Sequence, residues 1–219
     1  MPPSHTHERH VVSTAAAAQR VASEDRLLVE RGAAGLLIVV ADGAGGMRGG
    51  ARAADMLVQH VRANLLEVTC DGATAGALSG TLYRADRAIA ADPAAGETTA
   101  IALVVTEDRI LGASAGDSEA WLLDGEECDV LSASQDRRRI GSGRAAPSSF
   151  VRAFTRGVLI VATDGLFANA TLDAIRETMR RAPTDAIAQR LIERVRLPRG
   201  GLADDVAVVV VAAPLPFRT

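Results

Sequence analysis

Lysine is absent from this sequence of 219 residues, and its 24 basic residues are therefore all arginines. Apart from the triplet at residues 137–139, the arginines are spread along the chain, and 27 acidic residues leave a net charge of −3. Nucleic-acid-binding surfaces need clustered positive charge, so we expect no nucleic-acid partner. Because alanine and most arginine codons are rich in G and C, the composition also indicates a GC-rich, bacterial source.

Long apolar runs are absent too. The uninterrupted apolar stretches have the length of strands, whereas a membrane-spanning helix needs about 20 apolar residues. Residues 1–7 lack the basic start and the apolar core of a signal peptide. We therefore expect a soluble protein in the cytoplasm, without a membrane partner.

Cysteine and histidine are few and scattered. Cys70 and Cys128 lie in different expected elements, and in a reducing compartment such a pair is expected to be free thiols. Three of the four histidines fall within the first ten residues, and the fourth, His60, lies on an expected helix. A zinc site built from histidine and cysteine is therefore not expected.

Hydrophobic residues make up 48% of the chain, which is enough for one substantial core. We expect a single domain over residues 11–213. Residues 1–10 are polar and contain proline and histidine, so we expect them to form a tail, and residues 214–219 to form another.

Apolar periodicity divides this domain into strands and helices. The expected strands are two within residues 11–30, on either side of a turn at 22–25, and then 36–40, 98–106, 110–115, 119–123, 127–131, 158–162 and 206–211. The expected helices are 49–66, 73–91, 172–181 and 185–195, and residues 132–149 are expected to form a polar surface loop. Adjacent strands and paired helices favour an α+β fold of antiparallel sheets with helices packed outside, rather than a doubly wound parallel sheet.

Two of the expected strands end in the same dipeptide, Asp42-Gly43 and Asp164-Gly165. An Asp-Gly pair is usually a turn, and we interpret the other two pairs of the chain in this way. Asp42 and Asp164 differ because each follows a fully apolar strand. A carboxylate at such a buried end needs a counter-charge or several hydrogen bonds.

A third acidic pair, Asp204-Asp205, directly precedes the strand expected at residues 206–211. Carboxylates fixed at the ends of buried strands are suited to hard cations. Since no lysine can pair with them and zinc ligands are lacking, an all-oxygen site for Mg²⁺ or Mn²⁺ is the prediction.

Six short motifs occur in an order that resembles the metal-dependent protein phosphatases of the PP2C type. They are Arg20 with Glu24-Asp25, Asp42-Gly43-Ala44-Gly45-Gly46, Thr98-Thr99-Ala100, Gly116-Asp117-Ser118, Asp164-Gly165-Leu166-Phe167 and Ala203-Asp204-Asp205. Each motif alone is weak, but together they span residues 20–211, nearly the whole domain. The resemblance implies a four-layer α-β-β-α sandwich of two mainly antiparallel sheets flanked by helix pairs.

The resemblance also implies the metal ligands. Asp42 would bridge two Mg²⁺ or Mn²⁺ ions, and the Gly43 carbonyl would bind one of them. Asp164 and Asp204 would complete this pair, while the acidic pair Glu24 and Asp25 would hold metal-bound waters.

Four further residues receive roles from the same resemblance. Arg20 would bind the phosphate of the substrate. Asp117 would share a third, weaker metal site with Asp164. Asp205 would support the ligands, and Thr98 would support the adjacent strand.

The implied reaction is hydrolysis of phosphoserine and phosphothreonine in proteins. Two divalent cations would lower the pKa of a bridging water, and the resulting hydroxide would attack phosphorus. The guanidinium of Arg20 would hold the phosphoryl oxygens in line for this attack, without a covalent intermediate. No cysteine nucleophile is required, and both cysteines lie outside every motif.

Several positions depart from the family pattern or carry no expected function. Ala44 stands where some relatives have a histidine thought to protonate the leaving group, and the loop at 132–149 is short for the region that shapes substrate choice. The arginines at 137–139 are interpreted as a solvated surface. His60 and Trp121 are expected to pack, and Ser118, which has no base beside it, is expected to be structural.

We therefore expect a monomeric, metal-dependent serine/threonine phosphatase whose partner is a phosphorylated protein, opposite a protein kinase. Two alternatives stay open. One is a catalytically weak signalling or scaffold domain of the same fold, and the other is a phosphatase of small molecules that uses the same site.

Overall fold

The computed structural model of the chain describes residues 10–19, 22–32, 35–44, 49–65, 74–133 and 136–213. Within these ranges each named strand runs antiparallel to its neighbours, and the strands form two five-stranded sheets. Residues 1–9 and 214–219, expected as tails, lie outside the described residues. His10 is packed, because its ring stacks on Phe154 with 5.5 Å between the ring centroids.

The described strands and helices have the following bounds. One sheet has the spatial order β1 (Val11–Ala17), β10 (Val206–Ala212), β9 (Val158–Ala162), β6 (Glu119–Asp124), β7 (Glu127–Val130). The other has the order β2 (Asp25–Gly32), β3 (Gly35–Asp42), β4 (Ala100–Val105), β5 (Arg109–Ala115), β8 (Ser148–Ala153). The helices are α1 (Gly50–Leu65), α2 (Thr74–Ala90), α3 (Asp164–Phe167), α4 (Leu172–Arg181) and α5 (Ile187–Arg194), with a 3-10 turn, Thr184–Ala186, before α5.

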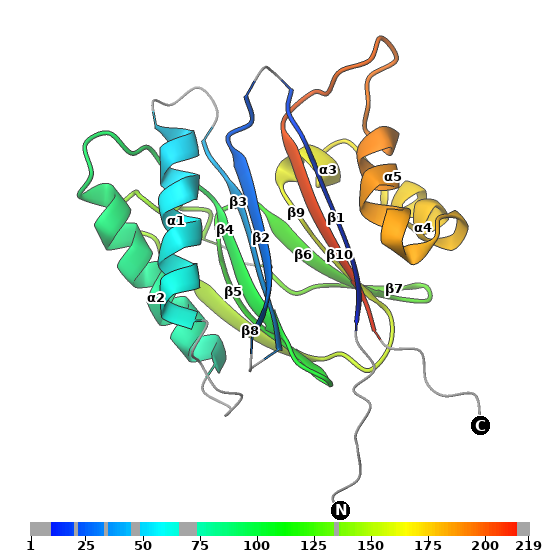
Figure 1. The fold of residues 1–219 in the computed structure, drawn as a ribbon, viewed down its shortest axis with the longest axis horizontal. Helices are drawn as coiled ribbons and strands as arrows, with labels where there is room; N and C mark the ends of the chain where they lie inside the picture. Colours follow the sequence, from blue (N-terminus) through cyan, green and yellow to red (C-terminus); the bar gives the residue numbers. More distant parts are fainter. Residues whose placement is uncertain are drawn as a thin grey trace, which may run out of the picture.

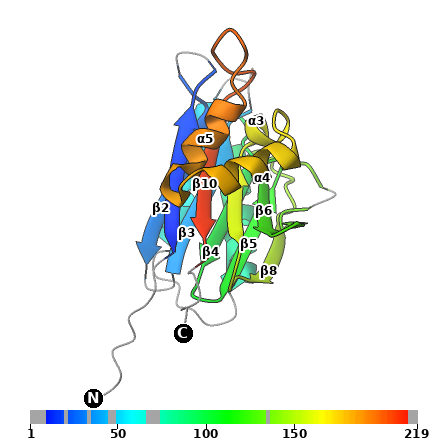
Figure 2. The same cartoon turned by 90° about the vertical axis from the view of Figure 1, so that its right-hand side faces the viewer.

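The two sheets lie face to face, with helices on both outer sides (Figure 1). Helices α1 and α2 cover the sheet that contains β3 and β4. Helices α4 and α5 lie across the sheet that contains β10, as the view turned by 90° shows (Figure 2). The four-layer α-β-β-α arrangement predicted from the motif resemblance is therefore confirmed.

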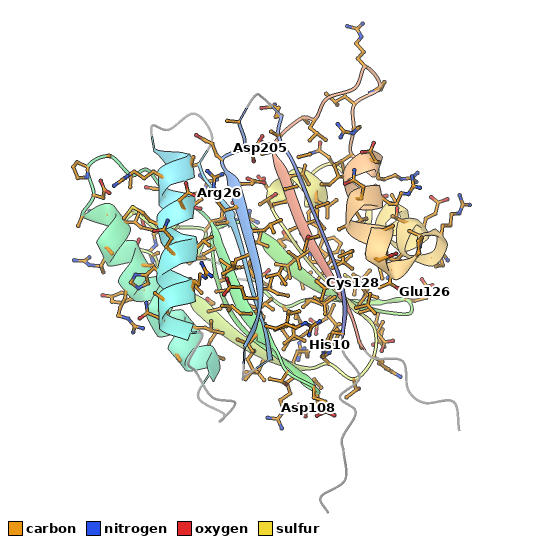
Figure 3. The ribbon with its side chains drawn as sticks, viewed as in Figure 1. His10, Arg26, Asp108, Glu126, Cys128 and Asp205 are labelled. Carbon is orange, nitrogen blue, oxygen red and sulfur yellow. The ribbon has the colours of Figure 1, made fainter. Side chains whose placement is uncertain are left out.

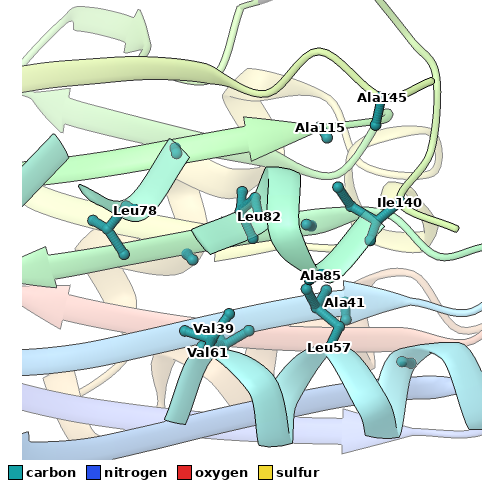
Figure 4. Close-up of a cluster of buried hydrophobic side chains, with 14 of the residues drawn as sticks. Val39, Ala41, Leu57, Val61, Leu78, Leu82, Ala85, Ala115, Ile140 and Ala145 are labelled. Carbon is teal, nitrogen blue, oxygen red and sulfur yellow. The ribbon is translucent and has the colours of Figure 1, made fainter. Parts of the chain in front are cut away.

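Strand β3 shows why its apolar run is continuous. Alternate side chains point to opposite faces of a strand, and here each face enters a different core. The residues facing α1 and α2 are Leu37, Val39 and Ala41, and those facing the other sheet are Leu36, Ile38 and Val40. Close to the first set, Leu57 of α1 and Leu82 of α2 fill the space between helices and sheet (Figure 4).

The sequence missed two elements. Strand β8, at residues 148–153, begins inside the expected loop and lies at a sheet edge, where most of its residues are exposed. Its apolar period is therefore weak. Helix α3 has four residues, which is too short to show a helical period. The other expected strands and helices are present, with ends that differ by a few residues.

None of the described helices is both long enough and apolar enough to cross a membrane. Strands β1 and β2 are consecutive in the chain but belong to different sheets. The chain therefore passes from one sheet to the other between them, at the end of the sandwich where the acidic residues also gather.

Candidate metal centre

The predicted acidic residues come from strand ends that meet at one end of the sandwich. Asp42 is the last residue of β3, and Asp25, the first residue of β2, lies opposite it in the antiparallel register. Asp117 follows β5, and Asp164 follows β9. Asp205, just before β10, lies at this end, whereas His10 and Asp108 lie at the opposite end (Figure 3).

Three carboxylates form the closest group. Asp42, Asp117 and Asp164 each place one oxygen so that all three oxygens lie within 4.8 Å of one another. All three residues are partly buried. Like charges at this separation repel, so the ionised group requires a compensating cation.

Two buried oxygen atoms in this region have no hydrogen-bond partner among the described residues. They are Oδ1 of Asp25 and Oδ1 of Asp117. The other oxygen of Asp25 accepts a hydrogen bond from the Thr163 hydroxyl at 2.8 Å. Unpartnered carboxylate oxygens beside Asp42 and Asp164 are the donor set that Mg²⁺ or Mn²⁺ binds, so these residues fit the implied metals.

The electrostatics of the cluster agree with this reading. Burial, followed by the charge of Asp164, raises the pKa of Asp42 to about 7. Burial, followed by the charge of Asp42, raises the pKa of Asp25 to about 8. Burial and the charge of Asp117 also raise the pKa of Asp164. The described chain thus leaves this cluster short of positive charge.

Two threonines fix the backbone of Asp42. Its N–H donates to Oγ1 of Thr99 at 2.9 Å, and its carbonyl accepts from the Thr98 hydroxyl at 2.9 Å and from the Thr99 N–H at 2.8 Å. Thr99 in turn shares a hydrogen bond of 2.6 Å with the Ser118 hydroxyl. Thr98 and Thr99 therefore hold the backbone of Asp42, and Ser118 is buried beside them.

Close backbone contacts account for both glycines that follow the strand-end aspartates. A Cβ on Gly43 would lie 2.5 Å from the carbonyl carbon of Gly50, where α1 begins. A Cβ on Gly165 would lie 2.0 Å from the carbonyl oxygen of Asp205. Both distances are too short for any side chain, so each Asp-Gly pair marks a packed crossing of two segments.

Asp205 connects the two sheets near the cluster. Its Oδ1 accepts the Gln19 N–H and its Oδ2 accepts the Glu24 N–H, each at 2.7 Å. It therefore binds residues on both sides of Arg20, which itself lies outside the described residues. The neighbouring Asp204 is exposed, and its negative charge contributes to the raised pKa values of Asp42 and Asp164.

The remaining predicted ligands lie outside the closest group. Glu24 accepts the Gly43 N–H with its carbonyl at 3.3 Å, and its Oε2 lies beside Gly50 at the start of α1. Ala44 is 3% exposed, and its N–H donates to the Glu97 carbonyl at 2.9 Å. The side chain of Ala44 is therefore buried, and its methyl group cannot donate a proton as a general acid would.

Sequence reasoning missed Arg139. Its Nη2 donates to Oδ2 of Asp117 at 3.3 Å, and its charge opposes the rise in the pKa of Asp42 and of Asp164. The interpretation of the whole triplet as solvated surface is therefore wrong for this residue. The neighbouring Ile140 could have indicated this, because it is an apolar residue inside a polar loop. In the structure Ile140 is fully buried.

The expected packing role of Trp121 is confirmed. Its ring stacks on Phe167 of α3, with 4.4 Å between the ring centroids. Helix α3 starts at Asp164. The single tryptophan of the chain, in β6, therefore contacts a ring that lies three residues after a candidate metal ligand, so its fluorescence is a probe close to the site.

Solved structures share this fold over almost the whole chain. A bacterial serine phosphatase matches with a TM-score of 0.86 and 14% identity, covering 95% of this chain and 100% of the other. The Mycobacterium tuberculosis serine/threonine phosphatase PstP/Ppp matches with a TM-score of 0.79 and 22% identity, covering 94% and 99%.

The catalytic domain of PstP in complex with two manganese ions also matches, with a TM-score of 0.78 and 22% identity over 93% of this chain and 97% of the other. No curated protein matches by sequence. The family model described as protein phosphatase 2C matches residues 14–196. The chain therefore belongs to the protein phosphatase 2C family.

Proposed function

We propose that this protein hydrolyses phosphoserine and phosphothreonine in proteins with Mg²⁺ or Mn²⁺ as its cofactor. The observation that carries the proposal is the group of Asp42, Asp117 and Asp164, whose oxygens lie within 4.8 Å of one another. Its position on fixed strand ends, in a chain of this family, supports a metal-dependent phosphatase.

The residue roles follow from position and charge. Asp42, Asp164 and Asp204 would hold two cations, with the carbonyl of Gly43 as a further ligand, and Asp117 would share a third cation with Asp164. Such cations supply an activated water at neutral pH and neutralise the charge of the phosphoryl group. Glu24 and Asp25 would complete the acidic surroundings on the other side of Asp42, the partner of Asp25 in the β2–β3 register.

The chain itself orients the substrate. Arg20 would bind the phosphoryl oxygens with its guanidinium fork, and Asp205 would keep the turn of Arg20 in place through its bonds to the Gln19 and Glu24 N–H groups. Since the side chain of Ala44 offers no proton, the leaving oxygen would take its proton from water. We expect activity to be lowest on substrates with poor leaving groups.

We further propose that the unit acts as a monomer on cytoplasmic phosphoproteins, opposite a serine/threonine kinase, with residues 11–213 as one catalytic domain. The structural neighbours include serine and serine/threonine phosphatases, which supports a phosphoprotein substrate.

A metal-dependence assay tests this function. Purified protein would be assayed with a chromogenic phosphomonoester and with a phosphothreonine peptide, in Mn²⁺, in Mg²⁺ and in EDTA. We expect turnover of both substrates that needs the metal. Absence of metal-dependent turnover at every pH from about 6 to 9 would contradict the proposal and favour a binding domain. Turnover of the small ester without the peptide would favour a small-molecule phosphatase.

A further inference from the structure

Arg139 extends from the loop after β7 into the acidic cluster. Its Nη2 lies 3.3 Å from Oδ2 of Asp117, and one third of its side chain is exposed. Its positive charge acts on Asp42 and Asp164 as well. The side chain therefore lies where the metal centre meets solvent, which is where a phosphorylated side chain has to enter.

The backbone next to Arg139 is fixed to the metal centre. Ile140 and Thr98 exchange two backbone hydrogen bonds, of 2.8 and 2.9 Å, and the side chain of Ile140 is fully buried. Thr98 also bonds the carbonyl of Asp42. Arg139 therefore directly precedes a residue that is bonded to Thr98, and Thr98 is bonded to Asp42, the proposed bridging ligand.

Asp86 of α2 fixes the next residues of the same loop. Its buried carboxylate accepts backbone N–H groups of Gly141, Gly143 and Ala145, at 2.8, 3.0 and 3.3 Å. Three N–H donors satisfy this carboxylate, as a buried charge requires. The loop is therefore fixed over residues 140–145, directly after Arg139.

The ion pair between Arg139 and Asp117 is incomplete. The described contact is one hydrogen bond of 3.3 Å, while Nε of Arg139 and Oδ1 of Asp117 are buried without partners among the described residues. For comparison, Arg26 binds Asp55 through two bonds, of 2.6 and 3.2 Å. The full fork of a guanidinium can bind a carboxylate through two such bonds. The fork of Arg139 has unused donors.

We propose that Arg139 is a substrate-binding residue whose guanidinium binds phosphoryl oxygens beside the metal centre, in addition to Arg20. The inference rests on the proposed function. A fixed positive charge beside Asp117 weakens cation binding there and strengthens anion binding at the same place. A phosphoryl group is the anion that this centre would admit, and its oxygens match the fork of a guanidinium.

Phosphate binding to the metal-loaded protein tests the inference without turnover. Inorganic phosphate would be titrated by calorimetry into Mn²⁺-saturated wild type, Arg139→Ala, Arg139→Lys and Arg138→Ala. We expect Arg139→Ala to weaken phosphate binding by about 10- to 100-fold, as for loss of a charge-assisted hydrogen bond. Arg139→Lys should be intermediate, because it keeps the charge and loses the fork.

Arg138→Ala is the matched control. Arg138 is the preceding residue, has an exposed side chain and pairs with Asp136 at the surface. Its loss should leave phosphate binding unchanged. If Arg139→Ala binds phosphate as tightly as wild type, or if Arg138→Ala weakens binding equally, the inference is overturned. Failure of wild type to bind phosphate would also count against it.

Metal binding provides a second readout. Mn²⁺ would be titrated into metal-free wild type and Arg139→Ala, with Trp121 fluorescence and calorimetry as signals. We expect unchanged or tighter binding in the variant, because a positive charge beside Asp117 is gone. Weaker Mn²⁺ binding would overturn the inference, since the phosphate loss would then follow from a damaged metal centre. If Arg139→Ala fails to fold, the phosphate and Mn²⁺ titrations are made with Arg139→Lys instead.

The two hypotheses fail differently. If wild type hydrolyses a phosphopeptide with Mn²⁺ and Arg139→Ala binds phosphate normally, the role of Arg139 is refuted and the proposed function stands. If phosphate binding depends on Arg139 but wild type shows no metal-dependent turnover, the proposed function is contradicted and the anion site stands.

Discussion

At the scale of single residues, the centre is an arrangement of carboxylates that repel one another. Burial and then the charge of Asp164 raise the pKa of Asp42 to about 7, and the charge of Asp42 helps to raise the pKa of Asp25. Fixed hydrogen bonds from Thr98 and Thr99 keep its backbone from moving away. On the proposed function, bound cations would compensate this repulsion, so the stability of the metal-free protein and its function would oppose each other here.

Replacement of Asp42 tests this opposition. We expect Asp42→Asn to abolish metal-dependent turnover and to stabilise the metal-free protein at pH 8 by about 2 kcal/mol, because a buried like charge is removed. Thermal denaturation in EDTA measures the stability. Asp173→Asn, at an exposed acid on α4, is the control and should change neither quantity. Normal turnover in Asp42→Asn would refute the site assignment.

Asp205 offers a second test at this scale. Asp205→Ala removes the acceptor of the Gln19 and Glu24 N–H groups, and the turn that contains Arg20 loses its support. We expect a rise in KM of about tenfold, corresponding to the loss of about one hydrogen bond to a charged group. Steady-state kinetics with a phosphopeptide measure it. A change confined to kcat would instead place Asp205 among the groups that act in the transition state.

At the scale of elements, the strand ends matter more than the strands. Asp42 and Asp164 end strands in different sheets, and the glycine after each permits another segment to cross at contact distance. The same end of the sandwich receives the loop of Arg139 through the bridge between Ile140 and Thr98. Close crossings of this kind fix side chains that are distant in sequence.

Gly165→Ala tests the crossing. Its new Cβ would lie 2.0 Å from the Asp205 carbonyl oxygen, so one of the two segments must shift. We expect a loss of about 3 kcal/mol in the free energy of unfolding, as in overpacked cores, and weaker Mn²⁺ binding. Denaturant unfolding gives the first and calorimetry the second.

Gly76→Ala is the matched control for this substitution. Gly76 lies in α2, and a Cβ there meets no atom within 4 Å. Because alanine favours a helix over glycine, this variant should gain up to about 1 kcal/mol. Equal stability of the Gly165 and Gly76 variants would show that the crossing is tolerant of a side chain.

At the scale of the whole molecule, pH and metal ions should control stability together. In the metal-free fold the raised pKa values keep protons on Asp25 and Asp42 at a pH where the unfolded chain has released them. The contribution of these two groups to stability is therefore complete below the ordinary carboxyl range and is lost as pH rises from there through about 7 to 8. His10 acts in the opposite direction below about pH 6.5, since burial lowers its pKa.

A thermal series from pH 6.5 to 8.5 separates these effects. We expect the Tm of the metal-free protein to fall across this range. Saturating Mn²⁺ should raise Tm, and the increase should grow with pH, because the cation binds ionised carboxylates and competes with protons. A Tm in EDTA that increases from pH 6.5 to 8.5 would contradict the assigned electrostatics.

Much of the fold could be predicted from the sequence, because local physics determines it. Continuous apolar runs such as residues 36–40 predicted buried strands, and helical spacing predicted α1 and α2. The edge strand β8 and the four-residue helix α3 were missed because neither carries a clear apolar period. The carboxylates of the site were found through motifs at strand ends, whose order in the chain is local information.

Tertiary structure alone decided which of these residues meet. The sequence could not show that Asp42, Asp117 and Asp164 are the closest three, because that depends on how two sheets stack. Nor could it separate Arg139 from Arg138, since adjacent residues of one loop point to different surroundings when Ile140 is anchored by Thr98. Residue types therefore determined the chemistry that is available, and the packing of distant strand ends determined where it is assembled.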